Sequence, residues 1–205
     1  MQQPNGRGVS MLEELTVRRS GSFTRQRILE AAILRFSRHS YEATTLRDIA
    51  ADVGIDVALV HRSFGSKEEL FRQAARAAFD DGFQRAVQAP DLDSAMAKHF
   101  LQSRLDPTLK MVDPLAIVTH SLGSDRANPI LRELVQQDFI LPLAQRLGCG
   151  DELQAGMAIA CLAGIALLRD VLCIPVLRDA SREQIRPLIE QLMHACLAQD
   201  RETPH

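Results

Sequence analysis

The chain has 205 residues, 46% of them hydrophobic and 24% charged, a globular composition that excludes wholesale disorder and leaves enough chain to bury a core. The formal net charge is only −2, but residues 15–76 carry 11 basic and 7 acidic side chains, whereas residues 77–205 carry 12 and 17. Because the N-terminal third is basic and the rest of the chain is acidic, the protein can bind a polyanion only at its N-terminal end.

The sequence shows no sign of a targeting or membrane segment. The N-terminal residues contain no long apolar stretch, so no signal peptide is expected. The longest nearly unbroken apolar run, residues 155–168, is shorter than the roughly 18 residues of a membrane span. The four cysteines are too few and too widely spaced for a disulfide framework. We therefore expect a cytoplasmic protein with no membrane partner.

The local patterns are helical throughout. No segment shows strands rich in β-branched residues separated by turns, and this absence argues against a β-sheet. Helix starts are marked by hydroxyl residues followed three positions later by an acid, as at Thr45 and Asp48 and at Ser66 and Glu69. We predict an all-α fold of about nine helices, at residues 24–38, 45–52, 56–63, 67–88, 92–104, 107–122, 128–147, 151–173 and 182–199.

Two short helices near the N-terminus have the pattern of a helix-turn-helix. Gly54 follows the first of them, at a position where a left-handed turn suits a residue without a Cβ. Asp56 is placed to cap the second helix, on which Val60 and Phe64 face inward one turn apart. This packing turns Ala58, His61 and Arg62 toward solvent, the face that a recognition helix offers to a major groove.

Residues 24–71 resemble the DNA-binding domain of the TetR family of bacterial transcriptional regulators. The resemblance is carried by RILEAA at 27–32 with Phe36, YEATTLRDIA at 41–50, GID at 54–56 and FGSKEEL at 64–70. In that family the second threonine, the recognition helix and the lysine that opens the fourth helix contact DNA. The resemblance thus implies phosphate contacts from Thr45 and Lys67, joined by a basic arm of Arg18, Arg19 and Arg25. The full set of implied DNA-binding residues is Thr45, Arg47, Val57, Ala58, His61, Arg62 and Lys67.

Some of these positions depart from the family or have a second interpretation. Ser40, Asp56, Ala58 and His61 stand where the family usually has Gly, Ser, Gly and Tyr. An acid at Asp56 is a sound helix cap but repels phosphate, whereas His61 can still reach phosphate, more strongly when protonated. Arg47 either faces DNA or makes a surface pair along its helix. The departures leave the fold intact and the operator sequence open.

The rest of the chain resembles, more loosely, the C-terminal regulatory domain of an actinobacterial-type branch of the same family, in residues 128–144 and 162–172. A helix that is apolar on every side must be buried on every side, and one protomer covers only part of the helix from Gly156. A two-fold four-helix interface would cover the rest, as in TetR-like proteins; a core helix buried within the monomer is the alternative. The expected dimer interface residues are Gly156, Ala160, Gly164, Leu168, Leu188 and Leu192.

The resemblance also implies a pocket for a small-molecule effector in the middle helices, although Met and Phe at helical spacing are more often plain core. The candidate lining residues are Phe100, Arg104, Met111, Ile117, His120 and Phe139. The histidines form no paired ligand spacing, and no catalytic or nucleotide-binding motif is present, so we expect no metal, no cofactor and no enzymatic activity.

Together these patterns predict four regions: a disordered arm (1–20), a three-helix DNA-binding domain (21–70), an effector-binding and dimerisation domain (71–200) and a tail (201–205). The expected protein is a homodimeric repressor that binds double-stranded palindromic operator DNA and is released by an effector. Two alternatives remain open. One is a helical small-molecule-binding protein or enzyme with a vestigial N-terminal domain, and the other is a regulator controlled by a protein partner.

Overall fold

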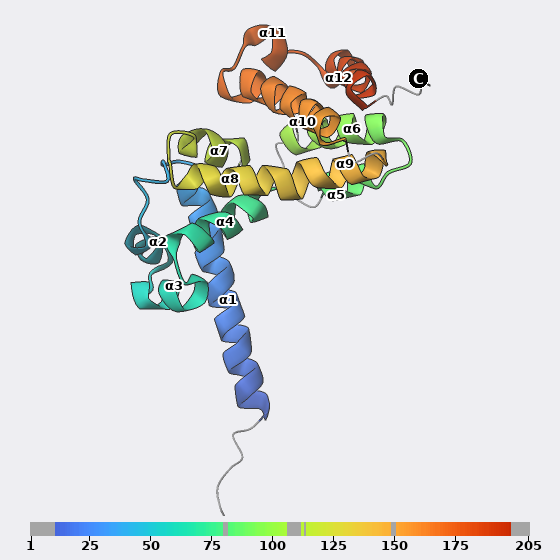
Figure 1. The fold of residues 1–205 in the computed structure, drawn as a ribbon. Helices are drawn as coiled ribbons and strands as arrows, with labels where there is room; N and C mark the ends of the chain where they lie inside the picture. The colour runs from blue at the N-terminus through green and yellow to red at the C-terminus, as the bar shows by residue number, and fades with distance from the viewer. Residues whose placement is uncertain (1–10, 80–81, 106–111, 113, 149–150, 198–205) are drawn as a thin grey trace, which may run out of the picture.

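The structure, a computed structural model, describes residues 11–79, 82–105, 112, 114–148 and 151–197, with side chains from residue 21 onward except those of 103–105. Every regular element in these ranges is helical, as predicted. In Figure 1 the short helices α2 (Leu46–Val53) and α3 (Val57–Phe64) lie at one end of the molecule, and α11 (Pro175–Arg178) and α12 (Arg182–Leu197) lie at the other.

The remaining helices connect these two ends. They are α1 (Met11–Phe36), α4 (Lys67–Ala78), α5 (Gly82–Val87), α6 (Leu92–Leu105), α7 (Pro114–Ser121), α8 (Ala127–Val135), α9 (Leu141–Leu147) and α10 (Glu152–Ala166), with π-helical turns η1 (Gln136–Ile140) and η2 (Leu167–Val171).

Helix α1 starts earlier than expected, at Met11, so residues 11–20 of the predicted arm are helical. The proline and glycines that suggested an arm all lie before residue 9, whereas residues 11–19 are mostly good helix formers such as Leu, Glu and Arg. The N-terminal half of α1 projects past α2 and α3 as a rod (Figure 1).

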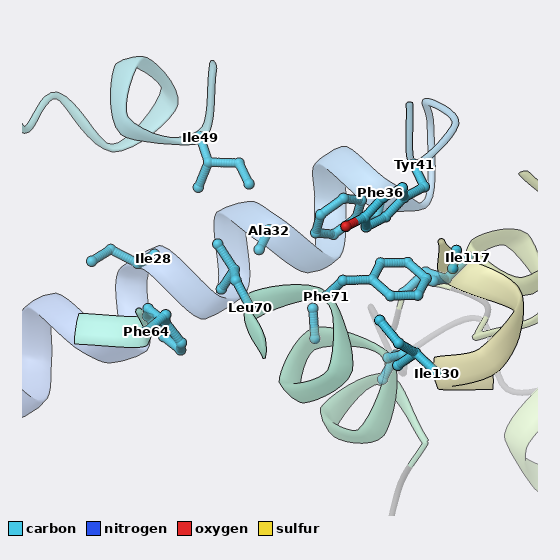
Figure 2. Close-up of a cluster of buried hydrophobic side chains, with 14 of the residues drawn as sticks. Ile28, Ala32, Phe36, Tyr41, Ile49, Phe64, Leu70, Phe71, Ile117 and Ile130 are labelled. Carbon is cyan, nitrogen blue, oxygen red and sulfur yellow. The ribbon is translucent and has the colours of Figure 1, made fainter. Parts of the chain in front are cut away.

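The first core cluster centres on three aromatic rings (Figure 2). The Phe71 ring stands edge-on to Phe36 and to Tyr41, with centroid distances of 4.9 and 5.0 Å, and all three side chains are fully buried. Edge-to-face pairs of this kind contribute about 0.5–1.5 kcal/mol beyond their buried area. Ile117 of α7 and Ile130 of α8 belong to the same cluster, so this core does not divide at residue 70.

The second core cluster lies between α5, α6, α9, α10 and α12. Phe139, on the π turn η1, packs against both clusters. Its ring centroid lies 4.8 Å from that of Phe79, at the end of α4, and 4.8 Å from that of Phe83 on α5. The π turn therefore contacts both the C-cap residue of α4 and the first helix of the second cluster.

Pro142 explains part of this arrangement. Proline has no N–H, so it cannot bond to the carbonyl of Asp138 four residues earlier. The side-chain amide of Gln84 on α5 donates to that carbonyl instead, at 2.9 Å. The Asp138 carboxylate accepts two hydrogen bonds from Arg76 on α4, at 2.7 and 2.9 Å. Pro142 thus lies in the first turn of α9, directly after the π turn that contacts α4 and α5.

Tyr41→Phe is expected to reduce the loss of stability at alkaline pH. Burial raises the pKa of the Tyr41 phenol, and the nearby Glu68 carboxylate raises it further. The phenol of an unfolded chain titrates near pH 10. The stabilisation is therefore complete below about pH 10 and is lost as the pH rises above it, because the unfolded chain releases the proton first.

Urea unfolding between pH 8 and about pH 11 measures this difference. Since Tyr41 is the one tyrosine of the chain, phenolate absorbance reports its ionisation directly. The lysines that titrate in the same range are present in both proteins, so their contribution cancels when the two pH profiles are compared. Identical pH profiles for the two proteins would contradict the burial argument.

Candidate nucleic-acid interface

The turn between α2 and α3 is closed by a left-handed glycine. Gly54 has φ 73°, its N–H donates to the Ala51 carbonyl at 3.1 Å, and the next N–H, of Ile55, donates to the Ala50 carbonyl at 3.0 Å. This conformation favours glycine because a Cβ is strained there. Ala50 itself is buried in the first core cluster, where its small side chain takes little room beside α3.

Helix α3 has the buried and exposed faces that the sequence predicted. Val60 and Phe64 are buried, while Ala58, His61 and Arg62 are exposed. A short helix with small and polar side chains on its open face can enter a major groove.

The first turn of α3 is fixed by Asp56. Its carboxylate accepts a 2.6 Å hydrogen bond from the backbone N–H of Ala58, so the acid acts as an N-cap. Val57, the first residue of the helix, is half-buried and packs against the first core cluster. Only part of the Val57 side chain therefore remains available to a ligand.

The orientation of His61 limits what its ring can recognise. Its Nδ1 lies 3.2 Å from the carbonyl oxygen of Gly65, and because a carbonyl only accepts, Nδ1 carries the proton. The other nitrogen, Nε2, is then an acceptor in the neutral ring and a donor in the charged ring. A phosphate contact thus requires the charged ring, whereas the amino group of a base can donate to the neutral one.

The Thr45 hydroxyl is occupied in the capping box at the start of α2. It donates to the Asp48 carboxylate at 2.7 Å and accepts from the Asp48 N–H at 3.2 Å. The Thr45 hydroxyl and the Thr45 backbone N–H, the latter at 2.9 Å, both donate to the Asp48 carboxylate and lower its pKa. The predicted box is confirmed, and a phosphate would have to compete with Asp48 for the hydroxyl proton.

Lys67, the first residue of α4, lies over an aromatic ring. Its Nζ is 4.0 Å from the centroid of Tyr41, and the side chain is half-buried. Burial lowers the pKa of Lys67, while the Glu42 and Glu68 carboxylates oppose that effect. The stacked ring holds the charge at the start of α4.

Arg47 is exposed on α2 and forms no ion pair with any residue that the structure describes. The surface pair considered as its alternative role is therefore not present there. The neighbouring acid, Asp52, is instead bound by Arg35 through two hydrogen bonds of 2.7 and 2.8 Å.

Sequence reasoning missed the role of Arg27 and Arg25 of α1. Arg27 donates to the carbonyl of Val53, the last residue of α2, at 2.9 Å. Arg25 donates to the carbonyl of Ser63, next to the end of α3, at 3.1 Å. A backbone carbonyl has the same chemistry at every residue, so nothing in the sequence marks these contacts.

The predicted dimer residues lie on an open apolar surface of α10 to α12. Gly156, Gly164 and Leu192 are half-buried, and Ala160, Leu168 and Leu188 are exposed. The alternative of a core helix enclosed by one chain is wrong, because Met157 on α10 is 53% exposed. The large exposed apolar side chains of this surface are Leu153, Met157, Leu167, Leu168, Val171, Leu172, Ile174, Val176 and Leu188.

Helix α10 continues through η2, so the apolar helix is longer than the run counted in the sequence. Residues 152–171, in which the mean hydropathy of an 18-residue window is 1.4, are long and apolar enough to cross a membrane by length and composition. One face of this helix, Ala155, Ala158, Leu162 and Ala166, is buried in the second cluster. Core helices of helical domains have the same composition.

The predicted pocket residues do not gather around one cavity in the described part of the chain. Ile117 belongs to the first cluster and Phe100 to the second, Phe139 packs on both, and His120 is exposed on α7. Arg104 and Met111 lie outside the described side chains. An open groove of about 450 Å³ lies between Asp91–Ser94 and α12 and contains none of the six. The pocket stays a prediction.

Comparison with known proteins decides the family. Residues 28–74 match the family model of bacterial regulatory proteins, tetR family, and residues 90–197 match that of the tetracyclin repressor-like C-terminal domain. The chain belongs to the TetR family. It is therefore a transcriptional regulator whose DNA-binding domain contains the helix-turn-helix of α2 and α3.

Two curated relatives each match part of the chain. An uncharacterized HTH-type transcriptional regulator of Bacillus subtilis, YfiR, is 33% identical over 79 residues, 38% of this chain and 38% of YfiR. IcaR of Staphylococcus aureus, a negative transcriptional regulator of the biofilm operon icaADBC, is 38% identical over 56 residues, 27% of this chain and 30% of IcaR. The matches thus span well under half of either relative.

Two solved structures have a similar fold. A TetR-family regulator of Streptomyces coelicolor, SCO0857, is 24% identical with a TM-score of 0.56, and the match covers 86% of this chain and 95% of that one. The multidrug binding protein EbrR, complexed with imidazole, is 19% identical with a TM-score of 0.63, and the match covers 97% and 100%.

Proposed function

We propose that this TetR-family regulator is a cytoplasmic repressor that binds a palindromic operator as a homodimer and is released by a small-molecule effector. The observation that carries the proposal is the exposed face of α3, set by the buried Val60 and Phe64. We assign the DNA contacts to Thr45, Arg47, Val57, Ala58, His61, Arg62 and Lys67. We assign no catalytic role to the chain.

The open apolar surface of α10 to α12 supports the homodimer. Nine large apolar side chains between Leu153 and Leu188 are exposed in the single chain, and a second copy packed on α10 to α12 would cover them. A Cβ at Gly164 would meet nothing within 4 Å, so a single chain has no need of a glycine there, whereas a closely approaching helix does. Two copies present two α3 helices to half-sites roughly 34 Å apart.

Repression and effector release are supported by what the relatives are. IcaR is a negative regulator, and the fold neighbour EbrR binds several drugs. We expect the effector to bind better when the two α3 helices are displaced from their DNA-binding positions. The effector then weakens DNA binding, and DNA weakens effector binding by the same factor.

A mobility shift with genomic fragments tests the proposal. We expect the protein to retard a small set of fragments that share an inverted repeat, and we expect the retarded complex to contain two chains. If no fragment is retarded even at low salt, where phosphate contacts are strongest, the regulator is not a direct DNA-binding repressor.

Arg62→Ala is expected to weaken operator binding while the oligomeric state stays unchanged. A good contact to a base is worth about 1–3 kcal/mol, so two contacts in a dimer correspond to a loss of roughly 30-fold or more. Arg132→Ala, which removes one charge from the exposed side of α8, is the matched control and should change affinity little. Unchanged binding by Arg62→Ala in a gel shift would remove Arg62 from the interface.

A further inference from the structure

Arg25 joins three helices at the end of the recognition helix. Its Nη1 donates to the Ser63 carbonyl at 3.1 Å, and its guanidinium carbon lies 4.1 Å from the centroid of the Phe64 ring. Its Nη2 donates to the side-chain oxygen of Gln73 on α4 at 2.5 Å. One side chain of α1 is therefore bonded to both α3 and α4.

The partners of Arg25 are themselves held in place. The amide nitrogen of Gln73 donates to the Glu69 carboxylate at 2.6 Å, and Arg72 donates to the other oxygen of that carboxylate at 2.6 Å. Phe64 is buried in the first core cluster. The guanidinium is thus fixed by two hydrogen bonds and a ring contact, all on ordered neighbours.

Helix ends explain why an arginine is suited to this place. The last carbonyls of a helix have no intrahelical partner and carry a partial negative charge, so a cation with several N–H groups stabilises them. Arg27 makes the same contact with Val53 at the end of α2. Two arginines of α1 therefore bind the C-terminal ends of both helices of the helix-turn-helix.

We propose that Arg25 is a positioning residue that sets the angle of α3 against α1 and α4, and is not one of the phosphate-binding residues of the arm. The inference rests on the proposed DNA-binding function. The N–H groups of Arg25 are directed to Ser63 and Gln73, and the charge of its guanidinium lies against the Phe64 ring. Arg25 thus acts on operator affinity through the orientation of α3.

Salt dependence separates a positioning residue from a phosphate ligand. The affinity of purified wild-type protein and Arg25→Met is measured against KCl concentration, on the fragment that the wild type selects and on an unrelated duplex of equal length. We expect operator affinity to fall at least about tenfold, because each protomer of the dimer loses hydrogen bonds made by a charged group. The salt slope and the affinity for the unrelated duplex should stay nearly unchanged.

A phosphate ligand gives a different result. The loss of one phosphate contact from each protomer lowers the slope by about 1.8 and weakens both duplexes alike, because such contacts do not read sequence. That result, or no change on either duplex, overturns the proposal. Arg132→Met is the control for loss of charge.

Arg25→Lys adds a second discrimination. A lysine can take the place of an arginine at a phosphate, because its charge alone binds the phosphate. It has no planar guanidinium, so it cannot bridge Ser63 and Gln73. We expect Arg25→Lys to lose most of the operator affinity that Arg25→Met loses. Wild-type affinity in Arg25→Lys would contradict the proposal.

Hydrogen exchange of the protein without DNA distinguishes this inference from the proposed function. We expect backbone amides of α3 to exchange several times faster in Arg25→Met than in the wild type, and at the wild-type rate in Arg132→Met. If wild-type protein retards no fragment but exchange accelerates, the repressor proposal fails while the positioning role remains. Unchanged exchange contradicts the positioning role whatever the DNA result.

Discussion

Leu168→Glu combined with Leu188→Glu is expected to convert the protein into a monomer and to abolish operator binding at working concentrations. Both side chains are exposed in the single chain, at 42% and 64%, so the substitutions leave the two core clusters intact. Fully burying an exposed leucine contributes about 1.5–3 kcal/mol, and a dimer loses about half of that at each of four partly exposed leucines while it also gains buried carboxylates. The dimer dissociation constant should rise by at least about 10²-fold.

Sedimentation and a gel shift measure the two consequences, and circular dichroism checks that the helices persist. Leu122→Glu is the matched control, because Leu122 is also exposed, at 57%, but lies after α7, outside the α10 to α12 surface. A double variant that remains a dimer would place the dimer interface elsewhere. A wild type that is already a monomer at micromolar concentration would contradict the homodimer altogether.

Phe71→Ala is expected to lower the free energy of unfolding by about 3–5 kcal/mol, the range for removing a fully buried phenylalanine. The substitution removes both edge-to-face contacts, to Phe36 and Tyr41, and leaves a cavity where α4 meets α7 and α8. Operator binding should be lost at a lower temperature than in the wild type.

Urea unfolding and thermal scans give the size of this effect. Phe23→Ala is the control, since Phe23 lies on α1 and is 65% exposed, and substitutions at such positions usually stay within about 0.5 kcal/mol. A loss below about 1 kcal/mol for Phe71→Ala would mean that the aromatic cluster relaxes to fill the cavity.

Features that depend on neighbours in the chain could be predicted from the sequence. The capping box of Thr45 and Asp48, the left-handed turn at Gly54 and the exposed face of α3 each involve residues a few positions apart. Their geometry follows from hydrogen bonding and helical periodicity alone.

Features that depend on distant contacts could not be predicted in this way. The bond from Gln84 to the Asp138 carbonyl joins residues 54 positions apart, and the contact between Arg25 and Ser63 spans 38. For the same reason the sequence could not tell that the described candidate pocket residues belong to different clusters. Helical spacing places Ile117 on an apolar face but does not say which cluster that face joins.

The shared core of α4, α7 and α8 has a consequence for engineering. A fragment that ends at Ala78 would uncover Phe71, whose neighbours include Ile117 and Ile130. Chimaeras that exchange operator recognition between regulators by a cut after α4 should therefore express poorly. Chimaeras that also receive α7 and α8 with the first four helices should fold, because Phe71 then keeps its packing partners on these two helices.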